Sequence, residues 1–324
     1  MTRFELAGLL LLSIALPAAT AHAQANPYPT KPLHLILPFP PGGSTDLLGR
    51  ALADKLGESL GQQVIAENRP GAGGNVGAEA AARSAPDGYT LVLCAPSLAI
   101  SPSLYRKLNY DPLHDLAPIA LVATIPNLVV VHPSVPAKSL AELTQYAREH
   151  PGKLNFGSGG AGTSNHLAGE MFRALTKTDI VHVPYKGVET AMFALLADQV
   201  QMVVIGPPAA APHLKSGKMR ALAVLAKERY AGLPDVPTAA ESGMPEFEVE
   251  TWYGVLAPAA TPREIVVRLN NELVRIMQSQ DMRTRLATMG IEPLTSTPEG
   301  FGDFIKSEAT KWAQVVKESG AKVD

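Results

Sequence analysis

An apolar run that ends in prolines, glycines and hydroxyl residues constrains this chain most. Residues 33–46 read LHLILPFPPGGSTD, which predicts a buried strand over 33–39 and a helix opened by Ser44, Thr45 and Asp46. The first N–H groups of a helix have no partner within it and lie at the positive end of its dipole. A carboxylate or phosphate is stabilised there without a cationic side chain, and this loop has no Lys or Arg. The same residues also fit an ordinary turn in which Ser, Thr or Asp caps its own helix.

A second loop follows the same plan much later in the chain. Residues 154–166 read LNFGSGGAGTSNH, which predicts a short strand, a loop of glycines and hydroxyl residues, and a helix start. Ligands of α/β sheets lie beyond the carboxyl ends of the strands, where both loops are expected. The two loops therefore predict a clamp for an anionic ligand. Valine at Gly43 or Gly162 is expected to abolish binding and leave the fold intact, because it blocks close approach to the backbone.

The second loop also satisfies the dinucleotide pattern G-x-G-x-x-G through Gly157, Gly159 and Gly162. In dinucleotide-binding folds, the acid that binds the ribose lies at the far end of the following strand. Asp179 has a suitable separation but precedes the predicted strand 180–183, which puts it on the wrong side of the sheet. The position of Asp179 therefore disfavours a nucleotide cofactor.

Catalytic sites are also disfavoured by the residues. No serine lies in a G-x-S-x-G turn, and Cys94 ends an apolar strand, where an inert buried thiol is expected. His166 and Glu170 share a helix face, but neither H-E-x-x-H nor a third ligand at a recognisable spacing accompanies them, so we expect His166 to pack against or cap its helix. A Walker A sequence is missing too. We expect no metal, no cofactor and no enzyme activity.

Composition and charge narrow the class of protein further. The chain has 324 residues, of which 46% are hydrophobic, enough for two packed domains. Its formal net charge is −2 and it has no dense Lys or Arg block, so we expect neither nucleic acid nor a membrane surface as a partner. Cys94 is the only cysteine, so no intramolecular disulfide can form.

The N-terminus predicts export. Residues 9–16 form an apolar core too short to span a bilayer, and residues 21–23 read AHA, which matches an A-x-A cleavage site. We expect a signal peptide over 1–23, cleavage after Ala23 and a periplasmic protein. Because the charged leader is weak, a fraying amphipathic start is the alternative.

Strands and helices alternate along the rest of the chain in two α/β units. Strands are predicted at 33–39, 62–67, 89–94, 153–156, 180–183, 201–205 and 220–225. Helices are predicted at 44–58, 74–83, 140–149, 163–175, 187–196, 207–215, 262–278 and 298–319. Apolar segments at 119–131 and 251–258 are expected to cross between the units. Domain 1 then comprises 27–124 plus 253–324, and domain 2 comprises 125–252.

Start signals mark three of these helices. Thr261 is expected to cap the helix over 262–278, because a proline follows it and a glutamate lies three residues later. Ser139 and Thr297 are expected to open their helices in the same position. Trp312 and the valines near it give the last helix an apolar face that we expect to pack on the rest of the protein.

Several short motifs, in one order along nearly the whole chain, carry a resemblance to a known family. They are Pro38-Phe39-Pro40-Pro41-Gly42-Gly43, Glu67-Asn68-Arg69-Pro70-Gly71-Ala72-Gly73-Gly74, Pro86-Asp87-Gly88-Tyr89-Thr90, Val183-Pro184-Tyr185-Lys186-Gly187 and Leu233-Pro234-Asp235-Val236-Pro237-Thr238. With Tyr28-Pro29-x-Lys31-Pro32 before them, the chain resembles the tripartite tricarboxylate transporter substrate-binding proteins, the Bug or TctC-like receptors. The resemblance implies a periplasmic binding protein type II fold, in which two α/β domains close on a small carboxylated ligand at a hinged cleft.

The resemblance also implies which residues bind the ligand. In those receptors, backbone N–H groups, hydroxyls and water of the first loop and the second-domain loop hold one carboxylate, and rim residues contact the rest of the ligand. The residues expected here are Phe39, Pro41, Gly42, Gly43, Ser44, Thr45, Asp46, Ser97, Ser158, Gly159, Gly162, Thr163, Ser164, Tyr185 and Gly206. Asp46 would repel an anion, so we expect it to turn inward and cap its own helix. Tyr185 is either a rim residue or a packed ring with its hydroxyl on a backbone carbonyl.

The function that follows is an extracytoplasmic solute receptor. We expect a monomer that closes on a small carboxylate and delivers it to the subunits of a membrane transporter. The alternatives are a periplasmic sensor that docks on a signalling partner and, less well supported, an exported α/β enzyme. Because neither loop contains Arg or Lys, a bidentate guanidinium clamp is disfavoured, while dicarboxylates, tricarboxylates, aromatic acids and amino acids all stay open.

Overall fold

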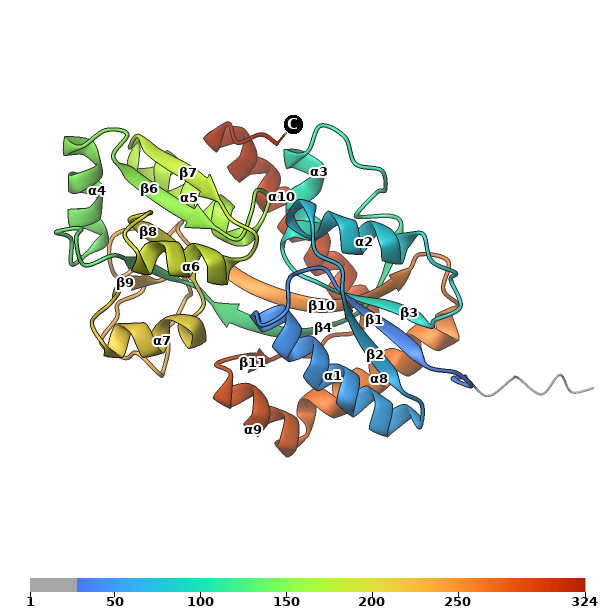
Figure 1. Ribbon diagram of the computed structural model, residues 1–324. Helices are drawn as coiled ribbons and strands as arrows, with labels where there is room; N and C mark the ends of the chain where they lie inside the picture. The colour runs from blue at the N-terminus through green and yellow to red at the C-terminus, as the bar shows by residue number, and fades with distance from the viewer. Residues whose placement is uncertain (1–27, 324) are drawn as a thin grey trace, which may run out of the picture.

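The computed structural model describes residues 28–323, so the predicted signal peptide and its cleavage site lie outside the described residues. The chain forms two β-sheets with helices packed around them (Figure 1). The elements up to the first crossing are β1 (Leu33–Leu37), α1 (Ser44–Leu60), β2 (Val64–Asn68), the 3-10 turn η1 (Ala72–Gly74), α2 (Asn75–Ala82), β3 (Thr90–Cys94), α3 (Ser97–Leu104) and β4 (Leu116–Pro126).

The second sheet is built from the middle of the chain. Its elements are β5 (Leu128–Val131), α4 (Leu140–Glu149), β6 (Leu154–Ser158), α5 (Ser164–Thr176), β7 (Ile180–Pro184), α6 (Val188–Leu196), β8 (Met202–Ile205), α7 (Pro207–Lys215) and β9 (Arg220–Val224). The chain then returns to the first sheet through β10 (Glu250–Pro258), α8 (Arg263–Gln278), α9 (Gln280–Thr288), β11 (Glu292–Pro293) and α10 (Pro298–Ser319).

Three parallel strands form one side of each sheet, and the loops after their carboxyl ends lie at the gap between the sheets. The first sheet has the order β11-β4-β10-β3-β1-β2, with β1 parallel to both β2 and β3. The second has the order β7-β6-β8-β5-β9, with β6 parallel to both β7 and β8. In both, a loop follows each of these strands and a helix starts, which is the arrangement that places a ligand beyond the strand ends.

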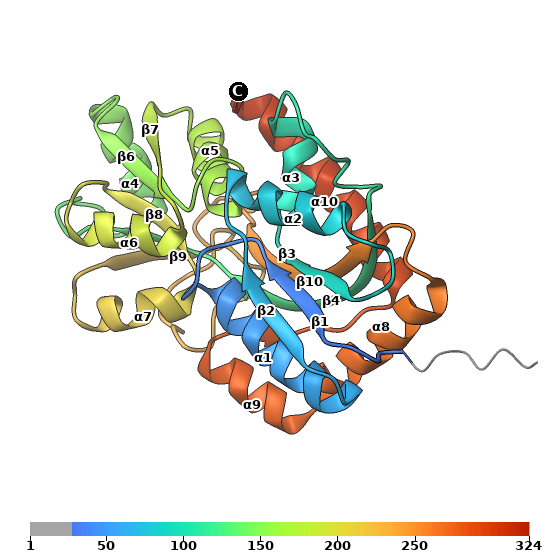
Figure 2. The same ribbon diagram turned by 45° about the vertical axis from the view of Figure 1, so that its right-hand side comes forward.

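Most strand residues are apolar because helices cover both faces of each sheet. Leu35 and Leu37 face α1, α8 and α9, whereas Ile36 faces α2, α3 and α10. The core on the second of these faces continues into the other sheet, where it includes Phe156 and Phe172. Figure 2 shows α1, α8 and α9 on one side of the first sheet and α2, α3 and α10 on the other.

The chain passes between the sheets at two neighbouring places. β4 ends at Pro126 in the first sheet and β5 begins at Leu128 in the second, so the crossing predicted within 119–131 is confirmed. The crossing predicted at 251–258 lies earlier, because all of these residues belong to β10 in the first sheet. Val249 still pairs with the end of the second sheet through its N–H and the carbonyl of Leu225. The domain boundaries at 124/125 and 252/253 stay a prediction.

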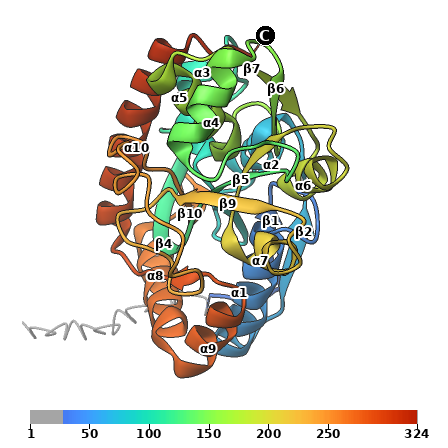
Figure 3. The ribbon, with the colours of Figure 1, turned by 90° about the vertical axis from the view of Figure 1, so that its left-hand side faces the viewer.

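The C-terminal helix α10 lies along both units. It packs on α3 and β4 and also reaches α5, where Nη2 of Arg173 donates to the carbonyl of Ser319 at 2.8 Å (Figure 3). Trp312 is fully buried, so the expectation that this helix packs on the rest of the protein is confirmed. Within residues 28–323, we find no helix with both the length and the apolarity that a membrane span needs.

One predicted helix cap is wrong. Thr261 does not cap α8, because Pro262 is the N-cap residue and Thr261 Oγ1 is buried with no hydrogen-bond partner among the described residues. The extended backbone of Pro262, with ψ of 137°, moves the helix start one residue beyond the reach of the threonine hydroxyl. Ser139 and Thr297 do cap their helices, with Oγ accepting from Glu142 N–H and Oγ1 accepting from Gly300 N–H.

Candidate functional site

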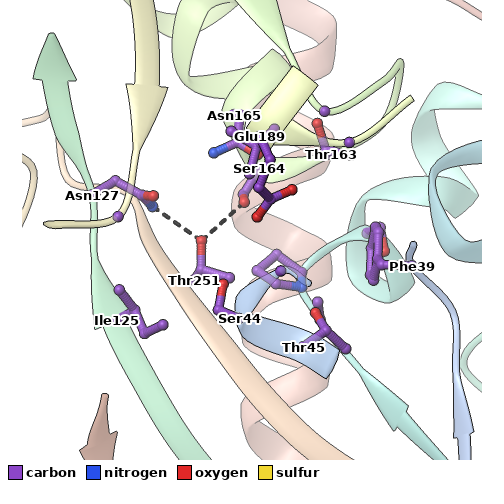
Figure 4. Close-up of a pocket in the computed structure, with 18 of the residues that line it drawn as sticks. Phe39, Ser44, Thr45, Ile125, Asn127, Thr163, Ser164, Asn165, Glu189 and Thr251 are labelled. Atoms are coloured by element: carbon purple, nitrogen blue, oxygen red, sulfur yellow. Dashed lines mark hydrogen bonds between the residues drawn. The ribbon is translucent and has the colours of Figure 1, made fainter. Parts of the chain in front are cut away.

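A cavity of about 80 Å³ lies between the two sheets, at the ends of their parallel strands (Figure 4). Both sheets and both crossing strands contribute to its wall. The lining residues are Phe39, Pro40, Gly43, Ser44, Thr45, Ala95, Pro96, Ser97, Ile125, Asn127, Gly159, Thr163, Ser164, Asn165, Gly187, Val188, Glu189, Gly206, Thr251 and Tyr253. Because it draws on elements from all parts of the chain, the cavity exists only when the two units face each other.

Helix starts surround this cavity. The N-cap residues of α1, α3, α5, α6 and α7 all line it, namely Gly43, Pro96, Thr163, Gly187 and Gly206. Each helix start carries about half a positive charge, and each stabilises a nearby anion by about 0.3–1 kcal/mol. The helix starts therefore favour an anion although no Lys or Arg lines the cavity within the described chain.

These helix starts differ in the N–H groups that they leave free. The N-cap of α1 is Gly43, which has no side chain and makes no cap, so the first turn at Ser44 and Thr45 is open to a ligand. α7 begins with Pro207 and a second proline, which have no N–H to donate. In α5, the Thr163 hydroxyl already accepts from the His166 N–H. Ser164 and Asn165 precede His166 in the first turn of α5, and their N–H groups have no partner within the helix, so α1 and α5 both keep N–H donors for a ligand.

Hydroxyl groups join the walls of the cavity. Oγ1 of Thr251 lies 3.1 Å from Oγ of Ser164, so a strand of the first sheet meets the first turn of α5 (Figure 4). Nδ2 of Asn127 donates to the same Thr251 oxygen at 3.1 Å. The hydroxyl of Tyr253 donates to Oγ of Ser44 at 3.0 Å, and burial raises the pKa of Tyr253 to about 12, so it remains a neutral donor. These groups can orient a polar ligand by hydrogen bonds alone.

A single charged side chain lines the cavity among the described residues. Glu189 stands in the first turn of α6 and extends toward α1, so that its Oε1 lies 2.8 Å from where a Cβ on Gly43 would be. It makes no hydrogen bond or ion pair with another described residue. Within residues 28–323, its carboxylate is the one side-chain charge that a ligand in the cavity would meet directly.

Asp46, by contrast, is turned away from the cavity. Its Oδ2 accepts from the Gly42 N–H at 3.0 Å, and its Oδ1 accepts from Asn68 and pairs with Arg50 at 2.9 Å. Burial by itself raises the pKa of Asp46, but the hydrogen bonds from Arg50, Gly42 and Asn68 outweigh it and hold the pKa below its usual range. Asp46 therefore turns inward as expected, although it braces the loop before the helix and does not act as the N-cap.

The structure brings most of the predicted binding residues to one cavity. Those that line it are Phe39, Gly43, Ser44, Thr45, Ser97, Gly159, Thr163, Ser164 and Gly206. Those that do not are Pro41, Gly42, Asp46, Ser158, Gly162 and Tyr185. Pro41 and Gly42 are exposed at the tip of the first loop.

The remaining predicted residues support the second loop instead. Oγ of Ser158 lies 2.6 Å from Nε2 of His182 and is fully buried. Gly162 has a φ of +83° and donates its N–H to Nδ1 of the buried His166, so the expectation that His166 packs against or caps its helix is confirmed, with Thr163 as the N-cap residue itself. Tyr185 is half-buried, packs against the core beside α6 and lines a neighbouring groove that shares Phe39 with the cavity.

Other lining residues were missed in the sequence. Asn127, Thr251 and Tyr253 belong to the two crossing segments, whose apolar sequence indicated a connection and not a binding wall. Asn165 follows directly after the predicted Ser164, and its Nδ2 donates to the carbonyl of Val204. Glu189 lies two residues after the Val183–Gly187 motif, which was the signal that could have found it.

Cys94, His166 and His182 do not line the cavity. Cys94 is buried at the end of β3, and burial raises its pKa to about 12, which agrees with an inert thiol. Nε2 of His166 lies 3.8 Å from Oε1 of Glu170. No group of three potential metal-ligating side chains occurs within residues 28–323.

Known proteins are similar to this chain in sequence and in fold. A family model described as the tripartite tricarboxylate transporter family receptor matches residues 48–321. The chain belongs to this family. The receptor is 40% identical to protein BugT of Bordetella pertussis, in an alignment that covers 100% of both chains. It is 37% identical to a UPF0065 protein of Pseudomonas sp. (strain P51), which covers 95% of this chain and 93% of that relative.

Solved structures confirm the predicted two-domain fold of the receptor. Rpa4515 of R. palustris, solved with adipate, has a TM-score of 0.86 and 36% identity and covers 91% of this chain and 100% of its own. MatC of Rhodopseudomonas palustris, solved with malate, has a TM-score of 0.82 and 34% identity and covers 89% of this chain and 100% of its own. The periplasmic binding protein BugD has a TM-score of 0.84 and 33% identity and covers 91% of this chain and 99% of its own.

Proposed function

We propose that this receptor, exported and cleaved after Ala23, binds a small carboxylate in the cavity between its sheets and delivers it to the subunits of a membrane transporter. The observation that carries the proposal is the ring of helix starts around a cavity without Lys or Arg. An anion in such a place is held by N–H groups and hydroxyls. Two of the similar structures were solved with a dicarboxylate, adipate in one and malate in the other.

Closure of the two units follows from the same contacts. The Ser164–Thr251 pair and the hydrogen bond from the Tyr105 hydroxyl to the carbonyl of Ala161 both join the sheets across the cleft. A ligand that contacts both walls favours this closed arrangement over an open one. We propose hinges at Asn127 and at Val249, where the chain passes between the sheets, and a monomer that binds its ligand without chemical conversion.

The proposal is tested by calorimetric titration of the protein without residues 1–23, refolded to remove co-purified ligand. Di- and tricarboxylates, aromatic acids and amino acids are compared with the matching amides and alcohols. We expect binding of at least one carboxylate and none of its amide, because the helix starts stabilise the negative charge. Binding of sugars or nucleotides alone would overturn the proposal.

Two variants on α3 test whether the carboxylate binds in this cavity. Ser97→Asp adds a negative charge to the cavity wall and is expected to weaken carboxylate binding by about tenfold or more. Ser103→Asp adds the same charge to the exposed side of the same helix and is expected to leave binding unchanged. Uptake of the labelled ligand by cells with the transporter subunits, with and without the receptor, tests delivery.

A further inference from the structure

Glu189 is the feature of the cavity that a simple carboxylate site does not explain. All other lining residues within the described chain are neutral, and the helix starts favour negative charge. Glu189 brings a second negative charge to the same space, 2.8 Å from the position of a Cβ on the N-cap residue of α1. A receptor for dianions would be weakened by this residue, because like charges in a partly enclosed site repel.

The position of Glu189 has an ordinary explanation that covers only part of the observation. An acid in the first turn of α6 interacts favourably with the dipole of its own helix. Glu264 occupies the same second position of α8 and is exposed to solvent. Glu189 instead extends into the cavity, near Ser164 and above Ser44 in Figure 4. Helix capping alone does not require this direction.

The carboxylate of Glu189 also lacks a partner inside the protein. The nearest basic residue in sequence, Lys186, lies at the neighbouring groove and makes no ion pair with it. Among the described residues, no hydrogen bond or ion pair satisfies the Glu189 carboxylate. A charged group at a cavity wall is stabilised when an opposite charge arrives with hydrogen-bond donors, as an ammonium group does.

We propose that Glu189 selects ligands that carry a protonated amine together with their carboxylate, so that this receptor prefers a small zwitterion to a dicarboxylate. The ligand carboxylate takes the N–H groups at the starts of α1 and α5, and its ammonium group pairs with Glu189. This inference rests on the proposed function, since it assigns the second charge of the ligand for the same cavity.

The test compares matched ligands on the protein without residues 1–23. Each amino acid, with its amine next to the carboxylate or at the far end, is titrated beside the acid of the same skeleton without nitrogen and beside the dicarboxylate of equal length. The series 4-aminobutanoate, butanoate and succinate is one example. We expect the tightest ligand to carry an amine and to bind about tenfold or more tightly than both of its partners.

Glu189→Gln keeps the shape of the side chain and removes its charge. It is expected to reduce the preference for the amine by about tenfold and to strengthen binding of the dicarboxylate. Glu264→Gln is the matched control at the same helical position and is expected to change neither affinity. A dicarboxylate as the tightest ligand of the unaltered protein, or an unchanged preference in Glu189→Gln, would overturn the inference and leave the proposed function standing. If no acid of any kind binds, the proposed function itself fails.

Discussion

Nδ2 of Asn127 donates to Oγ1 of Thr251 at 3.1 Å and thereby links the two strands that pass between the sheets. Asn127 is the residue between β4 and β5, and Thr251 is the second residue of β10. The same Thr251 oxygen lies 3.1 Å from Oγ of Ser164 in the first turn of α5. One hydroxyl at the crossing is therefore in contact with a helix start that faces the ligand cavity. Bending at the crossing would change both contacts together.

Thr251→Val removes the hydroxyl and keeps the packing of the side chain, because valine and threonine have nearly the same shape. Loss of the hydroxyl removes the contact with Ser164 and leaves Asn127 Nδ2 with only the carbonyl of Val249 as acceptor. We expect the free energy of unfolding in urea to fall by about 0.5–1.5 kcal/mol and the ligand affinity to fall as well. Thr90→Val on β3, outside the cavity, is the control. Unchanged affinity in Thr251→Val would contradict a role of this hydroxyl in closure.

The buried histidine pair predicts acid sensitivity. The rings of His166 and His182 stack at 4.0 Å, and burial lowers the pKa of His166 to about 3 and that of His182 to about 4. Between about pH 6.5 and these values, the unfolded chain binds more protons than the folded one, so stability falls as the pH falls through this window. Glu170 and Arg173 are the charged groups nearest to His166.

His182→Gln removes one of these titrating groups and keeps a polar group beside Ser158. The loss of melting temperature between pH 7 and pH 4.5 is expected to be smaller in this variant than in the unaltered protein. His34→Gln, at an exposed position of β1, is the control and is expected to follow the unaltered protein. Equal slopes for all three proteins would show that the histidine pair does not govern the acid sensitivity.

Two glycines of the ligand loops are expected to respond differently to alanine. Gly43 has a φ of −84°, which any residue adopts, and a Cβ there meets only the flexible end of Glu189. Gly162 has a φ of +83°, and its Cβ would lie 3.0 Å from the ring of Tyr105. Gly43→Ala should therefore weaken binding at nearly unchanged melting temperature, whereas Gly162→Ala should cost about 1–2 kcal/mol of stability.

This comparison revises the expectation that valine at either glycine leaves the fold intact. Of the two, only Gly43 lies in the cavity wall and in an ordinary backbone conformation, whereas Gly162 is a buried residue of the second loop that does not line the cavity. The measurement is a thermal melt of each variant beside a calorimetric titration. A Gly162→Ala variant as stable as the unaltered protein would contradict the strain assigned to this position.

Local sequence patterns predicted much of the fold. Strand and helix spacing located β1, α1, α5 and both ends of α10, because a buried face or a cap marks each of them. α3 was not predicted, since it contains Pro102 and begins after Pro96 without a capping side chain. α9 was not predicted either. It starts two residues after α8 ends, and only its cap residue Ser279 separates the two helices, so the sequence gives no clear boundary between them.

The two ligand loops were predicted from their glycines and hydroxyls, but the third wall of the cavity was not. Asn127, Thr251 and Tyr253 reach the cavity because two distant segments pair in one sheet across the crossing. A single sequence does not encode that pairing in a local pattern. The predicted cap at Thr261 was wrong for a different reason. Its capping pattern is complete in the sequence, but the extended backbone of Pro262 makes that residue the N-cap of α8.

The carboxylate of Asp46 braces the first loop. It accepts from the Gly42 N–H and Asn68 and pairs with Arg50, all at about 3 Å. Because the pKa of Asp46 is held below its usual range, the charged form stabilises the fold at pH 7, and this contribution is lost as the pH falls through the lowered pKa. Asp46→Asn is expected to lower the free energy of unfolding by about 1–3 kcal/mol at pH 7 and by less in strong acid.

Urea unfolding at several pH values measures this change in stability. Asp303→Asn, at an exposed ion-pair residue, is the control, and its effect is expected to be near zero. If Asp46→Asn and Asp303→Asn were equally stable at pH 7, the first loop would be held by its prolines and not by this carboxylate.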